Sequence, residues 1–131
     1  MIALDTNVIV RYLTQDDPLQ AAAAADLIES FSPEAPGFVA LVVVVELVWV
    51  LQSSYRAKRP EIVRSLEILL RSKELLVERA EIIWQALHRF AASNADFTDC
   101  LIERSGNAAE CEYTATFDRN AATSAGMRLV G

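Results

Sequence analysis

Short apolar runs and helical stripes alternate along the chain. Residues 1–4 are apolar, and Val8, Ile9, Tyr12 and Leu13 follow at helical spacing, which predicts a short buried strand, a sharp turn and a helix. Further stripes predict helices over residues 19–31, 60–70, 79–93 and from about 96–98 to 107, with brief strands at 75–77, 111–117 and 127–130. Strands and helices in alternation are typical of a parallel sheet with helices on both faces.

Residues 38–51 form the most apolar stretch and carry one charge, Glu46. The valines favour a strand, but the run is long for one, so a short strand near 38–40 that leads into a buried helix fits equally well. A membrane span is disfavoured, because the run falls short of ~20 apolar residues and has an acid inside it. In either structure Glu46 has an apolar neighbourhood, where a carboxylate is costly unless it meets a cation or a metal ion.

Length and composition predict one domain over residues 1–131. Apolar residues make up 53% of the chain, and four glycines and four prolines are too few for a disordered segment. The net charge of −6 argues against binding phosphate backbones through a basic surface, so a nucleic-acid partner would need a counter-charge. No export signal precedes the first helix, and we expect a cytoplasmic protein without a membrane partner.

Thiol and imidazole chemistry has little support. Cys100 and Cys111 are too few and too far apart for a thiolate zinc site, and we expect two buried free thiols. The single histidine, His88, falls opposite the apolar stripe of its helix, which predicts a surface position.

Four acids occupy positions that the predicted topology relates. Asp5 and Asp118 each follow a strand, Asp99 falls in the first turn of a helix, and Glu46 is expected in such a turn. Each of the aspartates alone is explained equally well as a helix cap, a turn residue or a partner of the helix dipole. Taken together they can converge at one sheet edge, where like charges need a cation. Oxygen ligands without His or Cys select Mg²⁺ or Mn²⁺.

Four segments resemble the acidic motifs of PIN-domain nucleases, in the family's order and spacing. They are Asp-Thr-Asn-Val at 5–8, the apolar run closing on Glu46-Leu47, Asp-Phe-Thr-Asp-Cys-Leu at 96–101, and Thr-Phe-Asp-Arg at 116–119. The likeness covers nearly the whole chain. Within the family, the compact size and the opening from Arg11-Tyr12-Leu13 to Asp17-Pro18 look most like VapC-type toxins of bacterial toxin-antitoxin pairs.

The resemblance implies a three-layer α/β/α PIN-like domain with a central, mostly parallel sheet of about four to five strands, and a helix around Glu46. It further implies a Mg²⁺- or Mn²⁺-dependent endoribonuclease that forms a homodimer and is held inactive by a cognate antitoxin. The metal ligands carried over are Asp5, Glu46, Asp99 and Asp118, with Thr6, Asn7 and Thr116 orienting ligands or the RNA phosphate. Asp96 is left as a cap or an indirect contributor.

Other functions fit parts of the pattern. A phosphatase of the haloacid dehalogenase type would need an aspartate where this chain has Asn7, and a receiver domain would need a lysine near the last strands, where none follows Lys73. An RNA-processing nuclease without a toxin role and a non-catalytic PIN-fold binding module remain alternatives.

Overall fold

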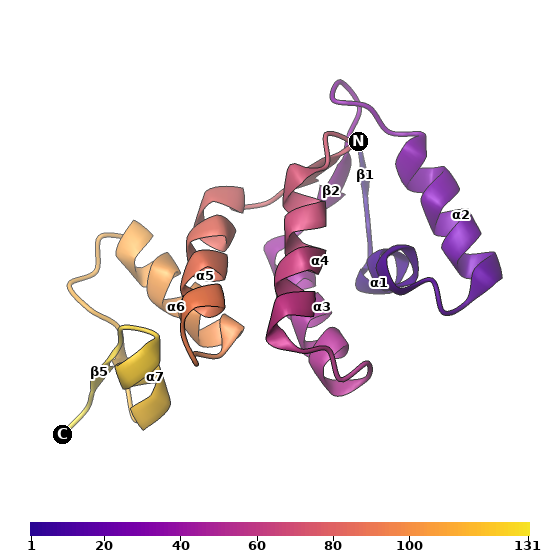
Figure 1. Cartoon of the computed structure of the whole chain (residues 1–131). Coiled ribbons are helices and arrows are strands. Elements are labelled where there is room, and N and C mark those ends of the chain that lie inside the picture. Colours follow the sequence, from indigo (N-terminus) through magenta and orange to yellow (C-terminus); the bar gives the residue numbers. More distant parts are fainter. The chain divides into compact units, whose positions relative to one another are not determined.

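A computed structural model describes residues 1–131, which divide into two compact units, Met1–Glu78 and Arg79–Gly131. Figure 1 traces the elements in chain order. The first unit contains β1 (Ile2–Ala3), α1 (Thr6–Thr14), α2 (Pro18–Glu29), β2 (Gly37–Val39), α3 (Leu41–Ser53), α4 (Arg59–Arg71) and β3 (Leu75–Val77). The second contains α5 (Ala80–Ala92), α6 (Phe97–Ala108), β4 (Ala115–Thr116), α7 (Arg119–Ser124) and β5 (Arg128–Leu129).

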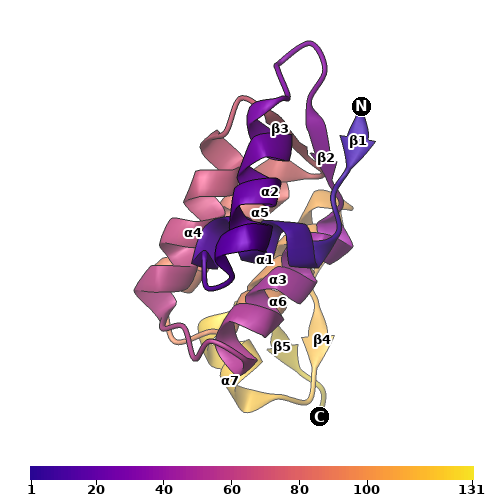
Figure 2. The ribbon, with the colours of Figure 1, turned by 90° about the vertical axis from the view of Figure 1, so that its right-hand side faces the viewer.

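The first unit is built on a three-stranded parallel sheet in the order β1-β2-β3 (Figure 2). Ile2 pairs with Gly37 in the first ladder, and Gly37 pairs with Leu75 in the second. The parallel pairing confirms the predicted α/β class. The expectation that the first strand is buried was wrong: β1 lies at the sheet edge with Ile2 exposed, and burial begins only at Leu4.

The apolar stretch over residues 38–51 is a short strand followed by a helix, which is one of the two structures that its composition allows. α3 buries Val44, Leu47, Val48 and Leu51, which recur at helical spacing. Its first backbone N–H, at Leu41, donates to Glu78 Oε1 over 2.8 Å, so a residue after β3 caps the helix. No helix of the chain has both the length and the apolar character that crossing a membrane requires.

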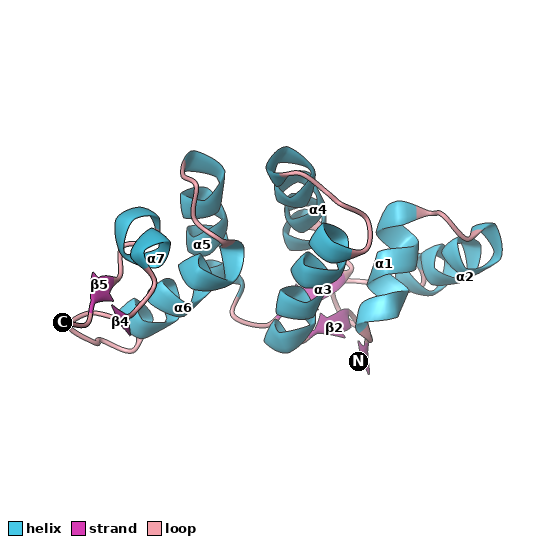
Figure 3. Cartoon of the chain, turned by 90° about the horizontal axis from the view of Figure 1, so that it is seen from below, coloured by secondary structure: helices cyan, strands magenta, loops and turns pink.

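Asp17 caps α2, and Pro18 takes the first position of the helix, where the N–H that proline lacks would have no partner within the helix. The helix ends at Glu29, two residues earlier than expected. α1 and α2 pack together within the first unit, and Ala21 and Ala24 of α2 are buried. Their small side chains allow a close approach between neighbouring elements. Figure 3 shows these two helices joined by a short loop.

The second unit is organised by the packing of α5 against α6. The predicted stripe of α5 is confirmed, since Ile82, Ile83, Ala86, Leu87 and Phe90 are all buried. The rings of Phe90 and Phe97 meet edge to face, 5.8 Å apart between centroids. Beside this pair of helices, β4 and β5 form a two-stranded parallel sheet. The five strands of the chain therefore fall into two parallel sheets, of three and two strands.

Two local expectations for the second unit were wrong. The strand expected over residues 111–117 is only Ala115–Thr116, since its partner β5 also offers only two residues for pairing. Both cysteines are free as expected, but only Cys100 is buried, while Cys111 lies exposed in the loop before β4.

Candidate functional site

Asp5 lies two residues after the end of β1 and is the N-cap of α1. Its Oδ1 accepts a hydrogen bond from the backbone N–H of Thr6 over 2.8 Å. Asp5 therefore caps the helix with its side chain, and the residue is nevertheless exposed to solvent. One oxygen of Asp5 is held by the helix terminus, while the second oxygen makes no hydrogen bond within the chain and can bind a ligand.

Thr6 connects α1 to α3 through its side chain. Its hydroxyl donates to Glu46 Oε1 in a short hydrogen bond. Thr6 is buried, at 5% exposure, and is the only buried polar residue of the chain, whereas Glu46 is exposed. The sequence places Glu46 in the first turn of its helix, but it is the sixth residue of α3 and lies in the second turn. Glu46 is thus fixed by a hydroxyl from the neighbouring helix.

A pocket of about 450 Å³ opens beside these acids in the first unit. It is lined by Asp5, Thr6, Asn7, Val10, Arg11, Glu46, Val50, Ser54 and Tyr55. The pocket therefore brings together Asp5, Thr6, Asn7 and Glu46, which are four of the residues predicted for the site, and its two walls are α1 and α3.

Arg11 and Tyr55 belong to this pocket, although the sequence predicts no role for them there. Arg11 Nη1 donates to Asp16 Oδ1 over 3.1 Å and to the Tyr55 hydroxyl over 3.2 Å. The Tyr55 hydroxyl donates to Asp16 Oδ2 over 2.8 Å. The hydrogen bonds from Tyr55 and Thr14, together with the charge of Arg11, lower the pKa of Asp16 despite partial desolvation. Three side chains from separate segments thus hold one another at the pocket wall.

The other predicted acids lie in the second unit. Asp96 is the N-cap of α6, with no side-chain capping hydrogen bond, and Asp99 lies in the first turn of that helix, as predicted. Burial raises the pKa of Asp99, and the neighbouring carboxylates of Asp96 and Asp118 raise it further. The three acids therefore repel one another's negative charge, which is the environment that a bound cation relieves.

Asp118 follows β4 and caps α7, which repeats the arrangement of Asp5. Its backbone N–H donates to Thr116 Oγ1 over 3.0 Å, and its Oδ1 accepts from the Asn120 N–H over 2.9 Å. The side-chain amide of Asn120 reaches back to the carbonyl oxygen of Asn94 over 3.4 Å. Thr116 thus contacts the backbone of Asp118, consistent with a supporting role, and Asn120 ties α7 to the segment that leads to α6.

The predicted ligands fit Mg²⁺ or Mn²⁺ in their chemistry, because all are carboxylates. His88 is exposed on α5, as expected. Within neither unit do three carboxylate, histidine or cysteine side chains stand close enough together to hold a metal ion by themselves. Asp5 and Glu46 belong to the first unit, while Asp96, Asp99 and Asp118 belong to the second.

β1 and β4 are each followed by an aspartate that caps the next helix, Asp5 and Asp118, and within the first unit Asp5 and Glu46 line a pocket. Acids at the carboxyl ends of parallel strands are typical of α/β proteins that bind ligands at this edge of the sheet. The model of the PIN domain family matches residues 2–125, and the chain belongs to this family. Comparisons with curated proteins and with solved structures find no match. The family match confirms the predicted three-layer α/β/α fold class. PIN domains are generally nucleases, and thus hydrolases, that use divalent metal ions.

Proposed function

We propose that this chain is a Mg²⁺- or Mn²⁺-dependent endoribonuclease that folds as a single domain over residues 1–131. The observation that carries the proposal is the hydrogen bond from buried Thr6 to Glu46, beside Asp5 in a solvent-accessible pocket. A merely stabilising carboxylate would need no orienting hydroxyl at the wall of a pocket. Membership in a family of nucleases supplies the class of reaction.

Under this proposal Asp5, Glu46, Asp99 and Asp118 bind the metal ion directly or through water. That all four act in one reaction rests on the family resemblance rather than on a distance. Each carboxylate has a fixed neighbour or a charged environment that suits the role: Asp5 accepts from the Thr6 N–H, Glu46 accepts from the Thr6 hydroxyl, Asp118 accepts from the Asn120 N–H, and Asp99 faces two other acids. A bound divalent ion would lower the pKa of a water for attack on the phosphate and neutralise charge on the leaving oxygen.

The residues around the carboxylates have positioning roles. The Thr6 hydroxyl holds Glu46 in one orientation, and Thr116 supports the backbone at Asp118. Asn7 lines the pocket beside the acids, and its amide is available to the RNA phosphate. Asp96 acts through its charge on Asp99. A divalent ion also explains how a chain with a net charge of −6 can hold RNA, because it inverts the local charge.

A role as the toxin of a toxin-antitoxin pair, with a cognate antitoxin and a homodimeric state, is the finer part of the proposal. It rests on the resemblance of the opening segment to VapC-type toxins. An RNA-processing nuclease without a toxin role is the main alternative, and a small adjacent reading frame that encodes a binding partner would separate the two. A non-catalytic binding module is the second alternative. Intact RNA cleavage by Asp5→Asn would show that the assigned acids are not the catalytic residues.

The deciding experiment is cleavage of a mixed RNA pool by the purified chain, with Mg²⁺, with Mn²⁺ and with chelator. Asp5→Asn and Asp99→Asn are compared with Asp26→Asn, which removes an exposed carboxylate of α2 that does not line the pocket beside Asp5. Metal-dependent cutting that is lost in the first two variants and kept in the third supports the proposal. A folded chain that cuts no RNA with any metal favours the binding module.

A further inference from the structure

The pocket of the first unit has two chemically different ends. On α1 the lining residues include Asn7, Val10 and Arg11. On α3 they are Glu46 and Val50, four residues apart on one helical face, and Ser54, the C-cap residue, continues this spacing. Thr6 donates to Glu46 near the start of α1, whereas Arg11, further along α1, donates to the hydroxyl of Tyr55, which lies two residues beyond the end of α3. The pocket is therefore a groove that runs along α1 and α3 from an acidic end to a cationic end.

The two ends are separated by an apolar middle. Arg11 lies six positions after Asp5, which corresponds to about 9 Å along a helix axis. Val10 and Val50 line the groove between these ends. A ligand that fits all three parts carries a group for the metal-binding acids, a less polar segment, and then an anion for Arg11. Successive phosphates of an RNA strand, joined by sugars, have this pattern.

Arg11 has hydrogen-bond donors left for such an anion. A guanidinium has five N–H donors. The Nε–H donates to Gln20 Oε1 over 2.7 Å, and the two N–H groups of Nη1 donate to Asp16 Oδ1 and to the Tyr55 hydroxyl. Both Nη2 hydrogens remain without a partner in the chain, and the three existing hydrogen bonds hold the guanidinium in place, so little conformational entropy is lost when it binds.

We propose that Arg11 binds a second phosphate of the RNA, next to the one that is cut, and so sets the position of the strand in the groove. The inference rests on the proposed nuclease function and adds a substrate-positioning residue and a subsite to it. Asp16 compensates part of the positive charge, which favours an anion that also makes contacts elsewhere in the groove over a free anion. An acidic side chain of a protein partner is the competing occupant.

The first test uses chemically altered RNA and the wild-type chain. Single-stranded oligonucleotides that the chain cuts are prepared with one neutral methylphosphonate linkage at successive positions around the cleaved bond. One neighbouring position is expected to raise KM by about ten- to a hundredfold with little change in kcat, because a charge-assisted hydrogen bond to a phosphate is lost. Equal KM values at every uncut position would overturn the inference and leave the proposed nuclease standing.

The second test uses Arg11→Gln and Arg11→Lys, with Arg64→Gln as a matched control on the exposed surface of α4. Arg11→Gln is expected to lose the sensitivity to the methylphosphonate position, Arg11→Lys to recover part of it, and Arg64→Gln to match the wild type. A fluorescently labelled oligonucleotide measures binding and cleavage by each variant. If Arg11→Gln binds and cuts it as well as the wild type does, Arg11 does not contact RNA, and an acidic side chain of a protein partner is the favoured occupant. A wild-type chain that neither binds nor cuts RNA would refute both proposals.

Discussion

The Thr6 hydroxyl on α1 donates to the Glu46 carboxylate on α3, so a buried side chain fixes the orientation of an exposed acid. The relationship distinguishes two roles for Thr6. A packing residue is replaced well by valine, which has the same shape, whereas an orienting residue is replaced only by another hydroxyl.

We expect Thr6→Val to lower metal-dependent RNA cleavage by about ten- to a hundredfold, as is usual when a group that orients a metal ligand is lost. Thr6→Ser keeps the hydroxyl and should retain most of the activity. Cleavage rates and melting temperatures of both variants are the measurements. Equal loss in both variants would mean that the methyl group, and hence packing, is what matters at this position.

Metal binding should appear as stabilisation of the folded chain. A ligand present at 100 times its dissociation constant raises the free energy of unfolding by about 2.7 kcal/mol. We expect Mg²⁺ or Mn²⁺ to raise the melting temperature of the wild type and of Asp26→Asn, with the increase abolished by chelator. Asp5→Asn and Asp99→Asn should show a much smaller increase. An undiminished increase in both variants would place the metal ion elsewhere.

The sequence predicts the α/β class, because strand and helix patterns differ in period and alternate along the chain. It leaves residues 38–51 open, since a stretch that is apolar on all sides has no informative period; family resemblance favours the helix that is found. The Arg11–Tyr55 contact could not be predicted, because it joins residues 44 positions apart through tertiary packing. The predicted length of β4 was wrong, since alternation within a segment does not indicate how many residues the partner strand offers for pairing.

The raised pKa of Asp99 predicts how replacing this residue changes the free energy of unfolding. A pKa that is higher in the folded state means that folding favours the protonated form, so this contribution to stability is present at low pH and lost as the pH rises through the folded-state pKa. In chelator near neutral pH, Asp99→Asn should therefore increase the free energy of unfolding, and the gain should shrink as the solution is acidified. Urea unfolding at several pH values measures both.

Asp26→Asn is again the control, because that carboxylate is exposed on α2. If Asp99→Asn were less stable than the wild type without metal, the carboxylate would be part of the structural framework. The assignment of Asp99 to metal binding would then be withdrawn.

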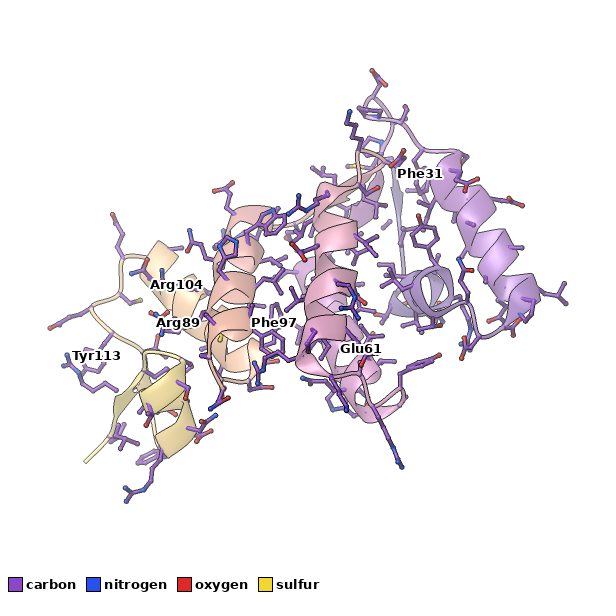
Figure 4. All side chains as sticks on the ribbon, in the orientation of Figure 1. Phe31, Glu61, Arg89, Phe97, Arg104 and Tyr113 are labelled. Atoms are coloured by element: carbon purple, nitrogen blue, oxygen red, sulfur yellow. The ribbon has the colours of Figure 1, made fainter.

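Gly37 of β2 allows Phe31 and Leu75 to pack closely against the strand that leads to α3. A Cβ at this position would lie 2.5 Å from Phe31 Cε2 and 3.2 Å from Leu75 Cδ2. The Phe31 ring, labelled in Figure 4, is nearly buried and has little room to shift. We expect Gly37→Ala to destabilise the chain by about 1–3 kcal/mol, the usual cost of overpacking. In a Phe31→Leu background the same change should cost less, and an equal cost in both backgrounds would exclude the ring as the cause.

Tyr55 stabilises the ionised form of Asp16, which predicts a pH-dependent effect at the cationic end of the groove. The Tyr55 hydroxyl is the first cause of the lowered pKa of Asp16, followed by the Thr14 hydroxyl. A lowered pKa contributes stability above the unfolded-state pKa, and the contribution is lost as the pH falls through the folded-state value. Tyr55→Phe should therefore be less stable than the wild type near neutral pH, and the two should converge in acid.

Tyr113→Phe is the matched control for this comparison. Tyr113 is exposed in the loop before β4, and its ring lies 4.0 Å from the Arg128 guanidinium, a contact that phenylalanine can keep. Its difference from the wild type should be small at every pH. If the loss in Tyr55→Phe were instead the same at neutral and acid pH, the Tyr55 hydroxyl would stabilise the chain without acting on the charge of Asp16. The hydrogen bond to Arg11 would then be its main contribution.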